Sequence, residues 1–316
     1  HMERRKIPAC GLEVSIVGIG CNNFGGRNNP EQTKAIIHAA LDLGITLFDT
    51  ADVYTRIRNG SSEEMLGQFL GTRRKDVVIA TKFGMAMSDR PMTSGGSRRW
   101  IMQAAEDSLR RLQTDYIDLY QMHRPDPRVP IDETLRALDD LVSSGKVRYI
   151  GSSNFAGWQI AEAELTARQH AYVPFVSSQV EYSLLNRTVE AEVVPAMVRY
   201  GQSMLPYYPL ASGILTGKYR AGQDAPAGTR LAAGGANSER FLNEQNLEVA
   251  QRLEAFAQER GHTILELALG WLGSLDYVGS VIAGATRPEQ VRANAAAALA
   301  WRLTPEELTE VDRLAV

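Results

Sequence analysis

The sequence predicts a parallel (β/α)8 barrel of the TIM type, with an N-terminal β-hairpin and extra C-terminal helices. Short β-branched runs recur eight times, and each is followed by a segment of helical period. Most of these runs begin about 30 residues apart, which is the length of one βα unit. The expected strands start at residues 15, 45, 77, 116, 147, 175, 203 and 278.

Several of the expected helices have recognisable ends. Asn29, Pro30 and Gln32 form the pattern of a capping box, and Gly44 ends the same helix. Further start signals are Ser61 with Glu64, Thr263 with Glu266, and Thr304 with Glu307. These signals place helices between the strands, as an alternating barrel requires.

The interval before the last strand is longer than the others. It is predicted to hold a Gly/Ala/Pro-rich loop over residues 221–243 and helices over 244–260 and 263–272. No change in composition marks a linker, so residues 1–316 are predicted to form one domain. Residues 4–15 are predicted to form a hairpin that could plug the barrel floor. A doubly wound open sheet is the alternative, because periodicity does not count strands with certainty.

Composition argues against several classes of function. Of the 316 residues, 44% are hydrophobic, and a net charge of −3 is interspersed rather than gathered into the basic stripe of a nucleic-acid-binding protein. No apolar run approaches the ~18 residues of a membrane span. Two cysteines, Cys10 and Cys21, and the lack of a secretory segment predict a cytoplasmic protein with reduced thiols. No Cys/His spacing indicates a metal site.

Chemically useful groups follow almost every predicted strand. Because the carboxyl ends of barrel strands open onto one face, these groups should converge on a single mouth. In chain order they are Gly20-Cys21-Asn22, Asp49 and Tyr54, Lys82, His123, Ser153-Asn154, Gln179, Tyr207, and Gly284 to Arg287.

Four of these side chains together suit proton transfer. Taken singly, Lys82 could be a solvated strand end, His123 could bond a backbone carbonyl, and Asp49 and Tyr54 could belong to a turn and the barrel rim. Together, the ammonium of Lys82 should stabilise a phenolate and lower the pKa of Tyr54. Asp49 would hold Lys82 protonated, and His123 would donate to a carbonyl oxygen or hydrogen-bond the phenol. A cofactor must then supply the electron pair.

With these residues in place, the sequence resembles an aldo-keto reductase over essentially the whole chain. The motifs that carry the resemblance are FDTADVY, ATKFG, YQMHRPD, GSSNF, YYPLASGILTGKY and GATRPEQVRAN, in family order and at family spacing. The resemblance implies NADPH-dependent reduction of aldehydes or ketones to alcohols. It makes Tyr54 the general acid, Lys82 and Asp49 its tuning pair, and His123 the group that positions the carbonyl.

The resemblance also implies a cofactor site along the mouth. Ser153, Asn154 and Gln179 would hold the nicotinamide carboxamide, and Tyr207 would stack on the ring, with Tyr208 as a rival. The other implied contacts are Gly20, Cys21, Asn22 and Asp49 at the first strand ends, Pro209, Leu210, Ser212, Gly213, Lys218 and Arg230 in the pyrophosphate loop, and Gly284, Thr286, Arg287, Gln290 and Asn294 at the adenosine end.

Arg287 bears on the choice of cofactor. It precedes a helix expected to begin near Pro288, where a cation opposes the helix macrodipole. A bound 2′-phosphate would explain it, which favours NADPH/NADP+ over NADH. A solvated arginine is the alternative.

The substrate pocket is expected to involve Asn22 and Asn23, with Phe24, on the wall opposite Tyr54 and His123. After Tyr54, the loop that holds Thr55, Arg56 and Arg58 is bulkier and more basic than the family often shows. These arginines could meet an acidic or phosphorylated substrate, or could simply be solvated. The sequence predicts neither the physiological substrate nor the oligomeric state.

Two alternatives to a general carbonyl reductase stay open. One is a reductase of a sugar phosphate or a glyceraldehyde-type substrate. The other is a cofactor-binding regulatory subunit, because the family resembles the β subunits of potassium channels. A long N-terminal extension would favour the subunit, and this chain begins almost directly with its hairpin. We therefore expect an enzyme that acts on a small-molecule carbonyl, without a nucleic-acid or membrane partner.

Overall fold

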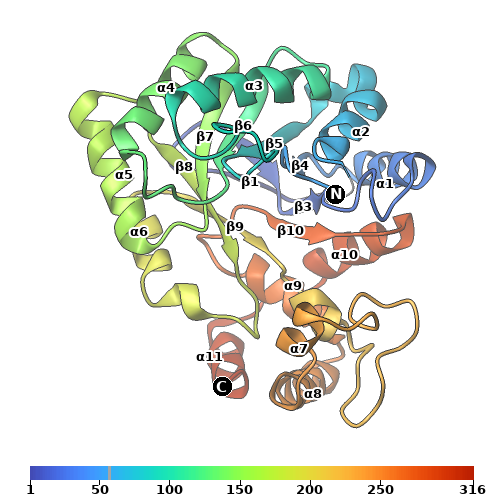
Figure 1. Cartoon of the computed structure of the whole chain (residues 1–316). Coiled ribbons are helices and arrows are strands. Elements are labelled where there is room, and N and C mark those ends of the chain that lie inside the picture. Colours follow the sequence, from blue (N-terminus) through green and yellow to red (C-terminus); the bar gives the residue numbers. More distant parts are fainter. Residues whose placement is uncertain (56–57) are drawn as a thin grey trace.

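A computed structural model describes residues 1–55 and 58–316. Among them, parallel strands form one sheet in the order β10-β3-β4-β5-β6-β7-β8-β9, wrapped by helices (Figure 1). The strands are β3 (Val17–Gly20), β4 (Leu47–Asp49), β5 (Val78–Phe83), β6 (Ile117–Met122), β7 (Val147–Ser153), β8 (Phe175–Glu181), β9 (Ser203–Tyr207) and β10 (Val281–Gly284). Each of the predicted runs overlaps one of them.

The two edges of this sheet meet next to Met204 on β9. The amide of Met204 donates to the carbonyl of Tyr277 at 2.7 Å, and the amide of Gly279 donates to the carbonyl of Met204 at 2.8 Å. Tyr277 and Gly279 lie just before β10, so these bonds close the sheet on itself. The predicted (β/α)8 barrel is confirmed, and the open sheet is not formed.

The N-terminal hairpin covers the floor of the barrel. Strands β1 (Arg4–Lys6) and β2 (Glu13–Ser15) pair antiparallel. Ile7, Leu12 and Val14 pack in one buried cluster with residues of the barrel strands, among them Leu47 and Ile282. The apolar plug excludes water from the amino end of the barrel, and the polar mouth lies at the other end.

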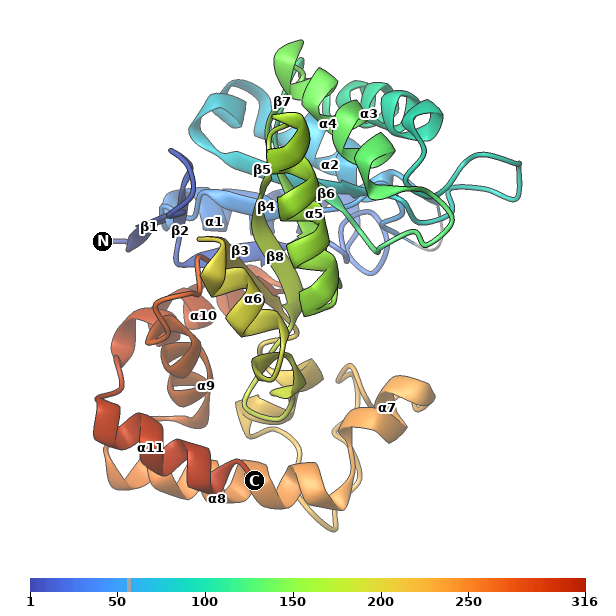
Figure 2. The ribbon, with the colours of Figure 1, turned by 90° about the vertical axis from the view of Figure 1, so that its left-hand side faces the viewer.

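The helices surround the strands as predicted, and Figure 2 shows α8 and α11 side by side below the barrel. They are α1 (Pro30–Asp42), α2 (Ser61–Leu70), α3 (Arg98–Leu112), α4 (Ile131–Ser143), α5 (Gly157–His170), α6 (Val193–Arg199), α7 (Ala236–Phe241), α8 (Glu244–Glu259), α9 (Ile264–Gly273), α10 (Pro288–Ala300) and α11 (Pro305–Leu314). Short 3₁₀ helices are η1 (Gly71–Asp76), η2 (Thr188–Glu190) and η3 (Ala211–Thr216). Within the described part of the chain, none of the helices has the length and apolar character to cross a membrane.

All four helix start signals mark the start of a helix, but only three of them form capping boxes. Capping boxes form at Asn29, Thr263 and Thr304. At α2, however, the N-cap is Gly60, with φ 89° and no side-chain cap bond, and Ser61 is already the first helical residue. A Cβ atom at Gly60 would lie 2.5 Å from Cδ of Arg111, so glycine is needed there for close packing as well as for its backbone angle.

The loop predicted over residues 221–243 contains a short helix that the sequence did not indicate. Helix α7 ends at Phe241, whose buried ring meets the ring of Tyr208 edge-to-face, with centroids 6.0 Å apart. One aromatic anchor therefore orders a segment whose composition predicted only a loop.

Candidate active site

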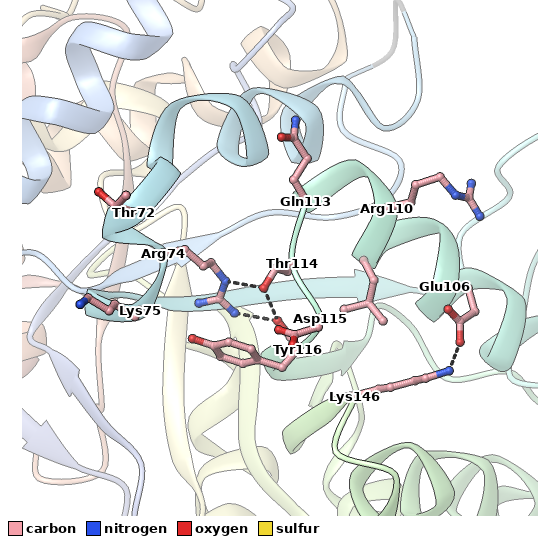
Figure 3. Close-up of a pocket in the computed structure, with 11 residues that line it drawn as sticks. Thr72, Arg74, Lys75, Glu106, Arg110, Gln113, Thr114, Asp115, Tyr116 and Lys146 are labelled. Atoms are coloured by element: carbon pink, nitrogen blue, oxygen red, sulfur yellow. Dashed lines mark hydrogen bonds and ion pairs between the residues drawn. The ribbon is translucent and has the colours of Figure 1, made fainter.

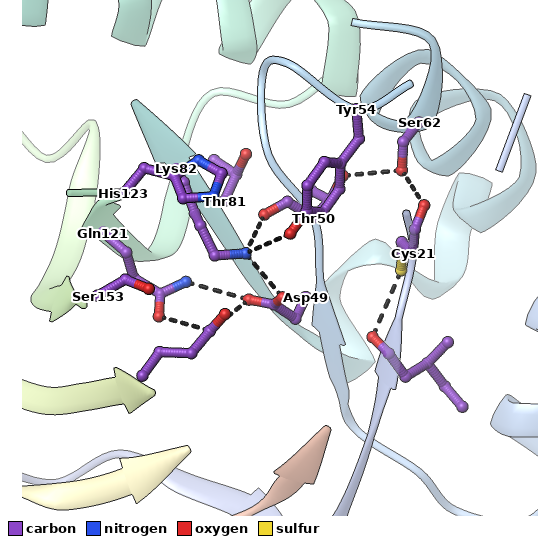
Figure 4. Close-up of polar contacts among 12 residues, drawn as sticks. Cys21, Asp49, Thr50, Tyr54, Ser62, Thr81, Lys82, Gln121, His123 and Ser153 are labelled. Atoms are coloured by element: carbon purple, nitrogen blue, oxygen red, sulfur yellow. Dashed lines mark hydrogen bonds and ion pairs between the residues drawn. The ribbon is translucent and has the colours of Figure 1, made fainter. Parts of the chain in front are cut away.

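Lys82 stands at the centre of a buried polar cluster at the carboxyl ends of the strands (Figure 4). It lies within β5 and is 1% exposed, not a solvated strand end. Its Nζ atom donates to Oδ2 of Asp49 at 2.7 Å, to the carbonyl of Thr50 at 2.9 Å and to the phenol oxygen of Tyr54 at 3.3 Å. An ammonium group can only donate, so the phenol oxygen accepts and the phenol proton stays free for another acceptor.

Two glutamines hold the other carboxylate oxygen of Asp49. Oδ1 accepts from Nε2 of Gln121 at 3.1 Å and from Nε2 of Gln179 at 2.8 Å. Nε2 of Gln179 also donates to Oε1 of Gln121 at 3.0 Å. Both amide hydrogens of Gln179 are thus used inside the site, which leaves its Oε1 atom as the group that a ligand could meet.

Gln121 is a site residue that the sequence reasoning missed. It lies two positions before His123 in the buried strand β6, so both side chains project toward the same side of the strand. An amide side chain at an inward, fully buried position of the strand was the available signal, because buried amides need partners.

The pKa values within the cluster depend on burial and on the opposed charges. Burial would lower the pKa of Lys82, but Asp49 and Tyr54 outweigh burial and raise it. Burial raises the pKa of Tyr54, and the charge of Lys82 opposes this rise without cancelling it. The expected lowering of the Tyr54 pKa is therefore wrong for the free protein. A protonated phenol is the form that a proton donor requires at neutral pH.

His123 follows β6 and faces Tyr54 across the mouth. Its amide donates to the carbonyl of Phe83 at 2.9 Å, and the two rings meet edge-to-face with centroids 6.1 Å apart. Among the described residues, the imidazole makes no hydrogen bond to the phenol, so the expectation of such a bond is not met. Burial, Lys82 and Arg124 lower the pKa of His123 to about 3. The neutral imidazole can still donate to a carbonyl oxygen.

Asn154 forms hydrogen bonds with residues at the carboxyl ends of three strands, β6, β7 and β9. Its Nδ2 atom donates to the carbonyl of His123 at 3.0 Å and to Oγ of Ser153 at 3.2 Å, and its Oδ1 accepts from the hydroxyl of Tyr207 at 2.7 Å. Its φ of 61° is a left-handed conformation that asparagine tolerates well. The ring of Tyr208 instead faces Phe241 and the guanidinium of Arg230, 5.2 Å away. Of the two tyrosines, Tyr207 is therefore the one tied to the predicted carboxamide-binding residues.

Paired glycines open the mouth between β3 and β10. Gly20 pairs with Gly284, and a Cβ atom at Gly20 would lie 3.2 Å from Cγ2 of Ile282 and 3.6 Å from the amide nitrogen of Gly284. A Cβ atom at Gly284 would lie 4.0 Å from Oδ1 of Asn22. The absence of side chains leaves room for an extended ligand beside Asn22. Cys21 differs, because it is fully buried with its amide bonded to Asp49 and its carbonyl bonded to Ser62, so its predicted cofactor contact is not supported.

The loop after β9 carries groups that suit a phosphate. Pro209 and Leu210 lead into η3, where Ser212 and Gly213 have φ of 57° and 99°. The buried hydroxyl of Ser212 has no partner among the described residues. A Cβ atom at Gly213 would lie 2.6 Å from Cε of Lys218, so the lysine packs directly against this turn. An unpaired hydroxyl and an adjacent ammonium are what a pyrophosphate group needs nearby.

The predicted adenosine end is built around the start of α10. Arg287 is the N-cap residue, exposed and without a side-chain cap bond. Gln290 accepts from the amide of Thr286 at 2.7 Å and from its hydroxyl at 3.0 Å, and Nδ2 of Asn28 donates to the Thr286 carbonyl at 2.9 Å. Gln290 therefore shapes this turn from within. Asn294 is buried on the same helix.

The expected substrate residues divide into those at the mouth and those elsewhere. Asn22 and Asn23 are partly buried in the loop after β3, but Phe24 is fully buried in the core, so its expected place on the pocket wall is wrong. Arg58 forms an ion pair with Glu64, and its side chain is exposed to solvent. Its guanidinium is therefore already paired and is not a free site for an anion. Arg56 lies outside the described residues.

Comparison with known proteins agrees with this geometry. The model of the Aldo/keto reductase family matches residues 16–316. The chain belongs to this family. A relative from Oryza sativa subsp. japonica, named a probable voltage-gated potassium channel subunit beta, is 36% identical over 98% of this chain and 96% of its own length. The L-glyceraldehyde 3-phosphate reductase of Escherichia coli K12 is 34% identical over 99% and 92%. An uncharacterized oxidoreductase of Bacillus subtilis 168 is 38% identical over 92% and 89%.

Membership of the aldo/keto reductase family supports an oxidoreductase, with carbonyl reduction as the family-level chemistry. This aldo/keto reductase also has a hollow of about 830 Å³ away from the cluster (Figure 3). The hollow adjoins Tyr116 and Lys146, which precede β6 and β7, and so lies at the opposite end of the barrel. Arg74 packs 4.0 Å from the Tyr116 ring and pairs with Asp118 at 2.8 Å, contacts that explain these groups without a ligand.

Proposed function

We propose that this protein is an NADPH-dependent reductase of aldehyde or ketone carbonyls, with Tyr54 as the proton donor. The observation that supports this most directly is the position of the Lys82 ammonium, 3.3 Å from the phenol oxygen of Tyr54 and 2.7 Å from the carboxylate of Asp49. A partly buried phenol held against a fixed cation at the mouth of the barrel suits proton transfer.

Each member of the cluster has a distinct role in this proposal. NADPH, when bound, would supply the hydride that reduces the carbonyl carbon. Tyr54 gives its proton to the carbonyl oxygen, and Lys82, which already donates to the phenol oxygen, stabilises the phenolate that forms. Asp49 keeps Lys82 charged and oriented, and Gln121 and Gln179 keep Asp49 in place. The neutral His123 donates a hydrogen bond that orients the carbonyl oxygen.

The same proposal assigns the cofactor contacts. Ser153, Asn154 and the free Oε1 of Gln179 would hold the carboxamide, with Tyr207 against the nicotinamide ring. Ser212 and Lys218 would meet the pyrophosphate. Arg287 would pair with a 2′-phosphate at the start of α10, where the helix dipole favours an anion and disfavours an unpaired cation.

A regulatory subunit is a second candidate, because the rice relative is named a probable channel β subunit at 36% identity. The catalytic cluster alone does not separate the two functions, since a cofactor-binding sensor could keep the same residues. A phosphorylated substrate is a third possibility within the first function, because the Escherichia coli relative is named L-glyceraldehyde 3-phosphate reductase.

The deciding experiment follows NADPH absorbance while the protein is offered a panel of aldehydes, ketones and phosphorylated aldehydes that includes glyceraldehyde 3-phosphate. We expect substrate-dependent oxidation of NADPH, lost in the Tyr54→Phe variant. NADPH binding without turnover across the whole panel would overturn the reductase and favour the subunit. A preference for phosphorylated substrates would place the protein with its glyceraldehyde-phosphate relative.

A further inference from the structure

The first turn of α2 holds three buried polar residues whose side chains form hydrogen bonds with other segments of the chain. Ser61, Ser62 and Glu63 are 6%, 0% and 0% exposed. Polar residues at a helix start usually cap that helix, but α2 has Gly60 as its N-cap and no side-chain cap bond. Their hydrogen-bonding groups are therefore available to other segments of the chain, and burial requires that they be used.

Ser62 contacts three segments that build the active site (Figure 4). Its amide donates to the carbonyl of Tyr54 at 3.1 Å, and its hydroxyl donates to the carbonyl of Cys21 at 2.7 Å. Its oxygen also lies 2.8 Å from the hydroxyl oxygen of Thr50. Because the single hydroxyl proton of Ser62 goes to Cys21, Thr50 is the donor in that bond.

One of these three partners belongs to the catalytic cluster, and the other two are one hydrogen bond from it. Tyr54 carries the phenol, the carbonyl of Thr50 accepts from Nζ of Lys82 at 2.9 Å, and the amide of Cys21 donates to the carbonyl of Asp49 at 2.8 Å. One buried serine thus joins the chain segments that place the phenol, the ammonium and the carboxylate.

Glu63 fixes the same turn from its other side. Its carboxylate accepts from the hydroxyl of Thr81 at 2.5 Å, the hydroxyl of Ser108 at 2.9 Å and Nε of Arg111 at 2.7 Å. Thr81 directly precedes Lys82 in β5, and the other two donors lie on α3. The turn that holds Tyr54 is therefore anchored to the strand that carries Lys82.

We propose that Ser62 is a positioning residue for carbonyl reduction, which holds Tyr54, Thr50 and Cys21 so that the phenol of Tyr54 stays within hydrogen-bonding distance of Lys82. Its catalytic consequence rests on the proposed function. Tyr54 lies on a loop and Lys82 on a strand, so their 3.3 Å separation is not fixed by the barrel itself. A misplacement of about 1 Å can cost a reaction about 100-fold in rate.

The kinetic test compares Ser62→Ala with Ser61→Ala. Both changes remove one buried hydroxyl from adjacent residues, but the hydroxyl of Ser61 donates to the carbonyl of Gly25, not to a residue next to the cluster. We expect Ser62→Ala to lower kcat by about tenfold or more, with the Kd for NADPH changed by less than about twofold, and Ser61→Ala to keep kcat near the starting value. An equal loss of kcat in both variants would overturn the proposal.

Thr50→Val removes the same Ser62–Thr50 hydrogen bond from its other end. The test therefore still holds if Ser62→Ala fails to fold. We expect it to lower kcat in the same direction, and the double variant to lose less than the product of the two single losses. Fully multiplicative losses would show that the two hydroxyls act independently, against the proposal.

A readout without turnover separates this inference from the proposed function. The ring-carbon resonance of Tyr54 in protein labelled with ¹³Cζ-tyrosine, assigned with Tyr54→Phe, reports the surroundings of the phenol oxygen. We expect it to move in Ser62→Ala and Thr50→Val and to stay in Ser61→Ala. An unchanged resonance in the first two variants would overturn the positioning role. A protein without turnover but with these shifts would fail only the proposed function.

Discussion

Nζ of Lys82 lies 3.3 Å from the phenol oxygen of Tyr54, across the gap between a buried strand and a loop. Asp49 and Tyr54 raise the pKa of Lys82 against the effect of burial. The lysine therefore keeps its proton and acts as a fixed positive charge. The mobile proton in the cluster belongs to the phenol, which accepts from Lys82 and can donate only to a group outside the pair.

Replacing Tyr54 by phenylalanine should remove this proton and leave the shape of the site unchanged. We expect Tyr54→Phe to lose about 10²- to 10⁴-fold in kcat for carbonyl reduction, the usual contribution of a positioned acid. NADPH should still quench protein fluorescence on binding, because the cofactor contacts remain. Tyr208→Phe, whose ring faces Phe241 and Arg230, is the matched control. Unchanged turnover in Tyr54→Phe would remove Tyr54 as the acid.

Replacing Lys82 by methionine should destabilise the fold, because the buried carboxylate of Asp49 loses its partner. We expect the free energy of unfolding in urea to fall by about 3–5 kcal/mol. Adding Asp49→Asn should restore part of this loss, since it removes the unpaired charge. Arg98→Met breaks the half-exposed pair with Asp140 and should cost less than about 1 kcal/mol. A similar cost for both lysine and arginine variants would contradict the burial argument.

The strands were predictable from the sequence because a parallel barrel buries both faces of each strand, which leaves uninterrupted β-branched runs. Capping boxes at Thr263 and Thr304 were equally local signals. Ser61 marked the start of α2, but the N-cap itself was not predictable, because Ser61 resembles a cap in sequence and only the packing of Gly60 against Arg111 shows why glycine takes that position. Helix α7 depends on a tertiary contact of Phe241 that no local pattern encodes.

The cluster of Asp49, Lys82 and Tyr54 could be inferred because strand order alone brings strand ends together. The supporting residues Gln121 and Ser62 could not be singled out in this way, because their roles depend on which buried partners they meet. The direction of the Tyr54 pKa was also beyond the sequence. A neighbouring cation predicts a lowered pKa, but the extent of burial, which only the fold reveals, decides the balance.

His123 should make the stability of the protein depend on pH below neutrality. Its pKa is 6.5 in an unfolded chain and is lowered to about 3 by burial, Lys82 and Arg124. Between these values the unfolded state binds a proton that the folded state does not, so stability falls as the pH falls from 6.5 toward 3. The contribution of this one group has a slope of up to about 1.4 kcal/mol per pH unit.

The test of this linkage is urea unfolding of His123→Gln and the unsubstituted protein across that pH range. The variant should lose less stability on acidification, and the difference should grow as the pH falls. His38→Gln, on an exposed part of α1, is the control for loss of an imidazole elsewhere. Parallel stability curves for the His123 variant and the unsubstituted protein would show that His123 is not held neutral.

Arg287 should distinguish NADPH from NADH. It is the N-cap residue of α10 and makes no side-chain cap bond there. Its positive charge therefore lies near the positive end of the helix dipole, which is unfavourable unless a bound anion lies between them. If a 2′-phosphate is that anion, Arg287→Ala should raise the Kd for NADPH by about 10- to 100-fold, the loss expected for charge-assisted hydrogen bonds, with little change for NADH. Arg292→Ala on the same helix, whose side chain lies 3.7 Å from Glu289, should affect neither cofactor. Equal weakening of both cofactors by Arg287→Ala would mean that the arginine never contacts the 2′-phosphate, and the preference for NADPH would then need another origin.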